Sequence, residues 1–267
     1  MRILTLALNT WESFVHNRLI MVVLILSGCI ILLMMFPLMR MRAYTNSANQ
    51  QMMEGAVLDM IAGVMGFVSG LGSLLAAWGA ADAYNMELKS GTVLAVMARP
   101  VRRWEFLAGK YAGVMLLMAS YVLLMFFLSY LLAWIGGEHF HTTPWVLLLY
   151  PLVRYAIYAA VAMLLATFVS PVVAMGIVLA IALLIAVTGP GVEKWGHNTQ
   201  WLKIGLYYVL PSTRLLSEDR FLIIKQASTK ATTALDHLVS LGYGAEYAAI
   251  LVLLAIWSFH YRTLRRD

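Results

Sequence analysis

The stretch that decides the fold is residues 111–135, which read YAGVMLLMASYVLLMFFLSYLLAWI. No charged residue interrupts it, and a helix with a rise of about 1.5 Å per residue would cross a hydrocarbon core of roughly 30 Å within this length. Similar apolar runs recur along the 267 residues, of which 62% are hydrophobic and 12% charged, with a mean hydropathy of +0.80. This composition excludes a water-soluble globule and predicts an all-α integral membrane protein.

Six membrane spans are expected in a single transmembrane domain over residues 1–267. They cover about residues 19–39, 56–81, 111–135, 145–169, 172–187 and part of 243–261. Ser170 and Pro171 form the turn between the fourth and fifth spans, because proline ends one helix and can open the next. An even number of spans puts both termini on the same side of the membrane.

Residues 1–18 are expected to form a helix that lies in the membrane interface. An apolar stripe at helical spacing consists of Leu4, Leu8, Trp11, Phe14 and Val15. Polar residues fill the rest of the helix, which is typical of an interfacial segment, and the alternative is a frayed tail. A cleavable signal is excluded because Arg18 stands directly before the apolar run.

The distribution of basic residues predicts the orientation. Ten lie on the side of the termini and the polar segment 82–110, and eight lie on the other side, six of them in the long segment 188–242. Long segments have little weight in the positive-inside rule. The comparison is therefore between ten basic residues on the side of the termini and two on the other side. We therefore expect a multi-pass protein of the inner (plasma) membrane with both termini in the cytoplasm. Segment 188–242 is either re-entrant or an extracellular cap, and these alternatives stay open.

The chain carries no motif for enzyme chemistry or for a bound cofactor. Gly109 and Lys110 do not belong to a phosphate-binding loop, because Trp104 stands where that loop requires glycine. The net charge of +6 is explained by contact with anionic lipid rather than by nucleic acid. His139 and His141 could share a metal with Glu138, but two loop histidines more often only solvate a turn.

Methionines gather around the outer end of the first two expected spans. They are Met34, Met35, Met39, Met41, Met52 and Met53. Thioethers bind Cu(I), but they also fill apolar gaps, and we favour packing over copper contact. The single cysteine, Cys29, is likewise expected to pack within the first span.

The polar segment 82–110 is the most informative part of the sequence. Residues 92–98 form a short apolar helix bracketed by Gly91 and Pro100, and charged residues flank it on both sides. A helix of this kind cannot bury its apolar side chains alone, so it is suited to docking in a groove of another protein. The alternative is an interfacial helix lying on lipid.

A pattern in this segment resembles the signature of permease subunits of type-2 ABC exporters, and is closest to NosY-like permeases. The pattern consists of Glu87, Gly91-Thr92, Arg99-Pro100, Arg102 or Arg103, and Gly109-Lys110. The resemblance implies two permeases, a homodimer or pseudodimer, on two separate ATP-binding subunits that hold ATP and Mg²⁺. It also implies that the short cytoplasmic helix acts as a coupling helix, with roles for Glu87, Gly91, Thr92, Arg99, Pro100 and Arg103. The chain departs from the family in having no basic loop at Ser170-Pro171.

Two charged residues, Asp59 and Arg154, lie within the second and fourth expected spans. An intramembrane charge must face protein or water, so we expect the two to form a structural pair. A substrate-facing role and separate snorkelling are the alternatives. Span 2 also contains Gly63, Gly66, Gly70 and Gly72, which are expected to allow close helix packing.

The sequence supports transport more strongly than two other function classes. The expected function is export of a substrate that the sequence does not identify, driven by ATP hydrolysis in a partner subunit. The alternative is a membrane anchor or assembly platform without transport. A secondary transporter is disfavoured because inverted halves with matching broken spans are not visible.

Overall fold

The computed structural model describes residues 2–43, 50–90, 102–135, 144–191 and 234–261. These residues form seven helices and no strand, which confirms the expected all-α fold. The helices are α1 (Arg2–Val15), α2 (Arg18–Ala43), α3 (Gln50–Ser90), α5 (Arg103–Ile135), α6 (Pro144–Ala166), α7 (Pro171–Gly191) and α10 (Ala234–Tyr261).

Within the described residues, three helices are long and apolar enough to cross a membrane. These segments are Trp104–Leu128, Leu148–Ala166 and His237–Tyr261. A fourth arises if Ile3–Val15 and Ile20–Leu33, which meet at a 66° bend, count as one broken span. Pro171–Leu183 is apolar but shorter. The part of the chain that the structure describes thus contains three or four candidate spans, and six spans stay a prediction.

Helix α3 does not end where the apolar run ends. The apolar span expected to end near Ala81 is part of a longer helix, because α3 has 41 residues and continues to Ser90. No glycine or proline occurs between residues 82 and 90, so polarity changes there without breaking the helix. Likewise α5 has 33 residues and starts at Arg103 rather than near Tyr111. Of the polar segment 82–110, residues 82–90 and 103–110 therefore belong to helices α3 and α5. We call the remaining residues, 91–102, the link.

Both helices are longer than a membrane crossing requires. At about 1.5 Å per residue they measure about 62 and 50 Å, against a hydrocarbon core of roughly 30 Å. We call the final part of α3, residues 82–90, and the first part of α5, residues 103–110, the stems of the link. The segment expected at 188–242 narrows in the same way, since α7 reaches Gly191 and α10 begins at Ala234; residues 192–233 lie outside the described residues.

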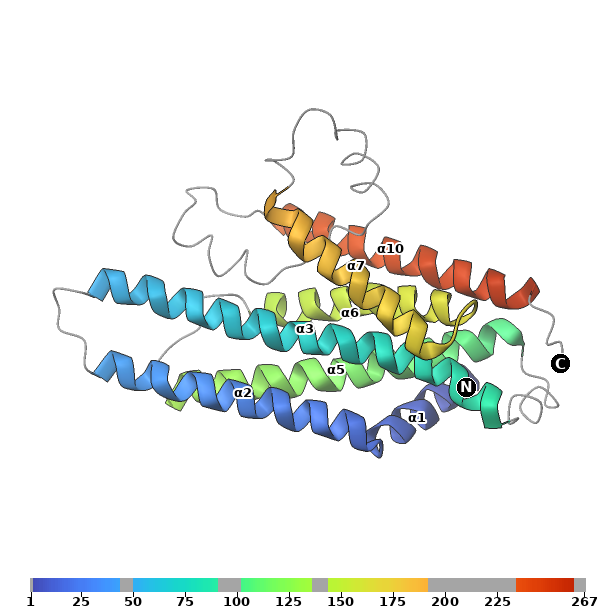
Figure 1. Cartoon of the computed structure of the whole chain (residues 1–267), viewed down its shortest axis with the longest axis horizontal. Coiled ribbons are helices and arrows are strands. Elements are labelled where there is room, and N and C mark those ends of the chain that lie inside the picture. Colours follow the sequence, from blue (N-terminus) through green and yellow to red (C-terminus); the bar gives the residue numbers. More distant parts are fainter. Residues whose placement is uncertain (1, 44–49, 91–101, 136–143, 192–233, 262–267) are drawn as a thin grey trace, which may run out of the picture.

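From α2 to α10, successive described helices alternate in direction along one long axis (Figure 1). The start of α1, the end of α3, the start of α5 and the end of α10 lie at one end of the molecule, which we call the link end (Figure 1). The end of α2 and the starts of α3, α6 and α10 lie toward the other, which we call the far end (Figure 1). The start of the first described helix and the end of the last thus lie at the same end of the molecule as the two stems (Figure 1).

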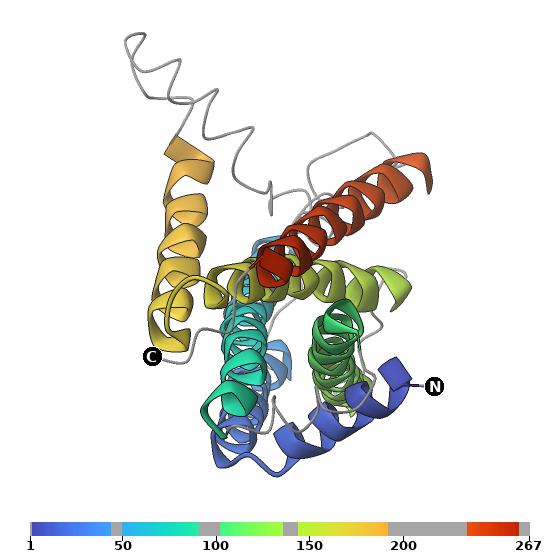
Figure 2. The same cartoon turned by 90° about the vertical axis from the view of Figure 1, so that its right-hand side faces the viewer.

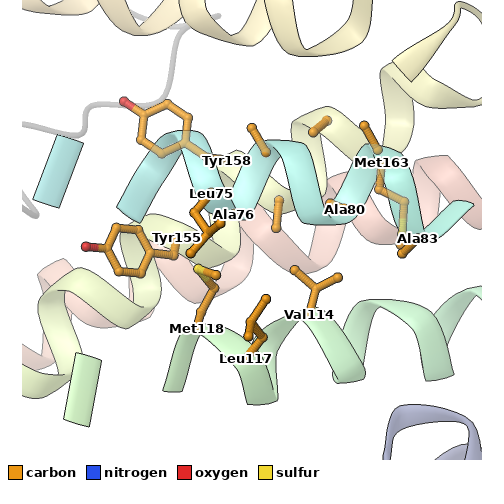
Figure 3. Close-up of a cluster of buried hydrophobic side chains, with 14 of the residues drawn as sticks. Leu75, Ala76, Ala80, Ala83, Val114, Leu117, Met118, Tyr155, Tyr158 and Met163 are labelled. Atoms are coloured by element: carbon orange, nitrogen blue, oxygen red, sulfur yellow. The ribbon is translucent and has the colours of Figure 1, made fainter. Parts of the chain in front are cut away.

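The core of the molecule lies between α3, α5 and α6. Helix α6 packs on α3 and on α10, and Figure 2 shows it passing between α10 and the pair α3 and α5. Small side chains of α3, such as Ala76 and Ala80, face Val114 and Met118 of α5 (Figure 3). Small residues allow helices to approach closely, which favours packing in a membrane where lipid is as apolar as the side chains.

Two local expectations can be compared with the structure directly. The turn at Ser170 and Pro171 is confirmed: α7 begins at Pro171, and the backbone N–H of Ala174 donates to the Ser170 carbonyl at 2.9 Å. Close packing at the α3 glycines is confirmed at Gly72, where an added Cβ would lie 2.8 Å from Cε1 of Tyr121. At Gly63 and Gly70 no described atom lies within 4 Å of an added Cβ, so close packing at these two glycines stays a prediction.

Candidate coupling site

The residues expected to mediate coupling lie in the link and at its two ends. Gly91, Thr92, Arg99 and Pro100 lie outside the described residues. Glu87 lies on the last turn of α3, and Arg103 is the first residue of α5. The fold brings both of these positions to the link end (Figure 1), which is the arrangement that a docking segment between two helices requires.

The start of α5 is fixed by a capping interaction. The backbone N–H of Arg102, the residue before the helix, donates to Oε2 of Glu105 at 3.1 Å. The first helical bond follows, from the N–H of Phe106 to the carbonyl of Arg102 at 3.2 Å. A glutamate that reaches back in this way satisfies an otherwise orphaned donor, and its charge lies at the positive end of the helix dipole. The chain therefore leaves the link at a defined point.

An aromatic cluster joins both stems to the last helix. We call Tyr84 of α3, Phe106 of α5 and Phe259 of α10 the aromatic clamp, and all three side chains are buried. The Tyr84 and Phe259 rings meet edge to face at 5.7 Å between centroids, and the Phe106 and Phe259 rings stack at 6.3 Å. Nζ of Lys110 lies 5.8 Å from the centre of the Phe106 ring. Such pairs favour one arrangement of the three helices.

Helix α1 lies directly against the first half of α5. An added Cβ at Gly109 would lie 2.8 Å from Cβ of Leu6, and one at Gly113 would lie 2.6 Å from Cβ of Thr10. The two glycines are four residues apart, so they share one face of α5 and let the α1 backbone approach. This contact gives the Gly109-Lys110 motif a structural reason that the sequence does not reveal.

The surface of α1 divides into three faces. Ala7, Thr10 and Phe14 are buried against the bundle. A second face is apolar yet exposed, and consists of Leu4, Leu8, Trp11 and Val15. Thr5, Asn9, Glu12 and Ser13 on the third face are polar and exposed. The expected stripe is thus correct except at Phe14, which packs inward because it lies on the α5 side of the helix.

A second polar cluster lies inside the bundle. The hydroxyl of Tyr121 donates to the Val68 carbonyl at 3.0 Å and lies 3.0 Å from Oγ of Ser27. The hydroxyl of Tyr155 lies 3.3 Å from Oγ of Ser69. These contacts join α2, α3, α5 and α6 where water is scarce, so each polar group obtains its partner from the protein.

Arg154 lies on α6 beside this polar cluster. The guanidinium carbon is 5.9 Å from the centre of the Tyr155 ring, and Nε and Nη2 are shielded from solvent. Asp59 lies on α3, but its side chain lies outside the description. The pairing of Asp59 with Arg154 therefore stays a prediction.

Helix α10 is joined near one end to α6 and near the other end to Thr167, the residue directly after α6. Toward the far end, the hydroxyl of Tyr150 lies 2.9 Å from Nδ1 of His237, and the two rings meet edge to face. Toward the link end, Oγ1 of Thr167 lies 3.1 Å from Oγ of Ser258. Sequence reasoning missed these pairs and the aromatic clamp, because each joins residues far apart in the chain.

The described residues contain no group of three or more His, Cys, Asp or Glu that could hold a metal ion. His139 and His141 lie outside the described residues, and so do the side chains of the methionine group. Cys29 lies within α2, in the first expected span, and is exposed there.

The comparisons with known proteins agree with the membrane architecture. A family model described as ABC-2 family transporter protein matches residues 4–264. No curated protein sequence matches the chain significantly.

Proposed function

Since the chain belongs to the ABC-2 family of transporter proteins, the membrane components of ABC transporters, we propose that it is the permease subunit of an ATP-driven exporter. ATP and Mg²⁺ bind to a separate ATP-binding subunit, and a second permease copy completes the membrane domain as a homodimer. Within the family we place the chain with the NosY-like permeases, on the spacing from Glu87 to Lys110.

The proposal includes the six-span topology with both termini in the cytoplasm. The alternation of helix directions supports it, because α1 starts and α10 ends at the link end (Figure 1). The exposed apolar face of α1 supports the placement of this helix in the membrane interface, since Leu4 is 62% and Leu8 47% exposed in the chain. The polar face of α1 would then contact water on the cytoplasmic side.

The observation that carries the proposal is the packing of the two helices that flank the link. Its stems are uninterrupted continuations of two long helices, and the aromatic clamp packs both of them against α10. Closure of the ATP-binding subunits would displace the link, and a displacement of rigid packed helices moves them as units rather than bending them locally. The long helices α3 and α5 would thereby open or close a path through the membrane domain.

The test is assembly with the candidate ATP-binding subunit, such as one encoded by an adjacent gene, followed by an ATPase assay. Glu87→Ala and Arg103→Ala should weaken co-purification, because a few anchors dominate the affinity of a docked helix. Glu246→Ala, a charge removal on an exposed position of α10, is the matched control and should leave binding unchanged.

Two results would contradict the proposal. Full co-purification of both link variants would show that docking does not use these residues. Co-purification without any effect of the permease on ATP hydrolysis would favour a membrane anchor or assembly platform instead.

A further inference from the structure

We infer that Phe259 is a positioning residue that couples the link to α10, and that α10 carries the displacement of the stems to the far end of the membrane domain. The inference rests on the proposed function, since it assumes that an ATP-binding subunit moves the link. It assigns a coupling role to the last helix, which the link signature does not include and the hydropathy pattern identifies only as a span.

The Phe259 side chain lies between the two stems. Its ring meets Tyr84 from α3 on an edge and stacks on Phe106 from α5. Only 2% of the Phe259 side chain is exposed, so the ring is enclosed by these neighbours rather than by lipid. A relative movement of the two stems therefore requires the end of α10 to move or these ring contacts to separate.

Helix α10 is attached to the rest of the bundle mainly through α6. Helix α10 packs mainly on α6 and less on α5. The Thr167–Ser258 pair lies one residue from Phe259, and the Tyr150–His237 pair lies near the opposite end of the same helix. The first pair attaches α10 to Thr167, the residue directly after α6, and the second attaches it to α6 itself; pairs near opposite ends of α10 oppose both sliding and rotation of α10 against α6, so the two helices form one unit.

The unit formed by α6 and α10 is long enough to cross the membrane. Helix α10 has 28 residues, or about 42 Å, and so runs from the aromatic clamp to the far side of a hydrocarbon core of roughly 30 Å. On the opposite face of α10, Leu253 and Trp257 are 65% and 63% exposed, and the ring contact that Trp257 makes is with Tyr261 of the same helix. A displacement that enters at Phe259 thus reaches Leu235, in the first turn of α10, through the α6 and α10 pair.

The experiment uses the full chain with its ATP-binding subunit in lipid nanodiscs. A single cysteine replaces Leu235, which is 67% exposed, in a Cys29→Ala background. The rate of its reaction with a hydrophilic maleimide is measured without nucleotide and after trapping with ATP and vanadate. We expect trapping to change this rate by at least about fivefold, the lower end of the range typical of coupling between distant sites.

Three further substitutions test the role of the ring. Phe259→Ala should reduce the effect of nucleotide on the labelling rate to less than about twofold, below the range typical of coupled sites, while the ATP-binding subunit still co-purifies. Phe259→Leu, which keeps most of the buried volume, should give a response between Phe259→Ala and the parent. Trp257→Ala is the matched control: it removes a larger ring from an exposed position two residues away and should keep the full response.

The outcomes separate this inference from the proposed function. If no ATP-binding subunit co-purifies with the parent, the proposed function fails. If the subunit binds and hydrolyses ATP but the parent labels at the same rate in both states, only the inference is overturned. A full response in Phe259→Ala, or an equal loss in Trp257→Ala, overturns it as well. If Phe259→Ala does not fold, a response of Phe259→Leu equal to that of Trp257→Ala overturns it, and a reduced response supports it.

Discussion

Replacement of Gly113 by alanine should separate α1 from α5 at their closest approach. The added Cβ would lie 2.6 Å from Cβ and 2.9 Å from Cγ2 of Thr10, and 2.8 Å from the carbonyl oxygen of Ala7. Optimal carbon contacts are about 3.5 to 4.0 Å long, so α1 must retreat by about 1 Å. Because one of the blocking atoms belongs to the backbone, a side-chain rotation alone cannot relieve the clash.

The expected magnitude is the difference between two opposing effects. Overpacking of this kind costs about 1 to 3 kcal/mol, whereas alanine is favoured over glycine in a helix by about 1 kcal/mol. Gly176→Ala in α7 is the matched control, since no described atom lies within 4 Å of its added Cβ and only the favourable helix effect applies. Gly113→Ala should therefore be less stable than Gly176→Ala by about 1 to 3 kcal/mol.

The assay is the midpoint of thermal unfolding of the purified full chain in detergent, with both variants measured under identical conditions. For a domain of this size, 1 kcal/mol corresponds to roughly 2 to 4 °C. Gly113→Ala should therefore unfold at least about 2 °C below Gly176→Ala. Equal midpoints would show that α1 does not lie in close contact with α5, and the three-face description of α1 would then be wrong.

Three further predictions concern topology, the intramembrane charges and the start of α5. In a cysteine-free background, a cysteine at Ser90 should resist a membrane-impermeant thiol reagent in intact cells while one at Thr229 should react; labelling at Ser90 from outside would reverse the orientation. In a double-mutant cycle on unfolding midpoints, the loss of stability in the double variant Asp59→Asn, Arg154→Gln should be much smaller than the sum of the two single losses. The reason is that a lone buried charge typically costs about 3 to 5 kcal/mol. Additive losses would show that the two residues do not pair. Glu105→Ala should lower stability by about 1 kcal/mol, whereas Glu105→Gln, which keeps an acceptor for the Arg102 N–H, should lose less; equal losses would contradict the capping role.

Helix boundaries show where sequence reasoning reached its limit along the chain. The turn at Ser170 and Pro171 was predictable because proline and the residue before it act on the local backbone. The end of α3 was not predictable from hydropathy, because the residues from 82 to 90 become polar but include no glycine or proline that would end the helix. Hydropathy predicts where a helix leaves the membrane and enters water. The residue at which the helix ends is predicted by glycine, proline and capping groups.

The candidate site divides in a similar way. The sequence located the link through Gly91, Pro100 and the charges that flank them, all of which are neighbours in the chain. It did not locate Phe259, whose role depends on rings from α3 and α5 that are more than 150 residues away. Nor did it explain Gly109, because the reason for that glycine is the side chain of Leu6 on another helix.

The sequence alone determined that this protein is an all-helical membrane protein of the ABC-2 permease type, with its link between two apolar helices. These properties depend on composition, local periodicity and motif spacing. Each of these can be read from the sequence without knowing which distant residues meet. The tertiary structure decided which faces of the helices meet: α1 on the glycines of α5, Phe259 between the stems, and α10 on α6. Lipid is as apolar as the helix surfaces, so hydrophobicity does not choose among these faces. Close steric fit and a few polar and aromatic pairs make that choice, and both exist only once distant helices have come together.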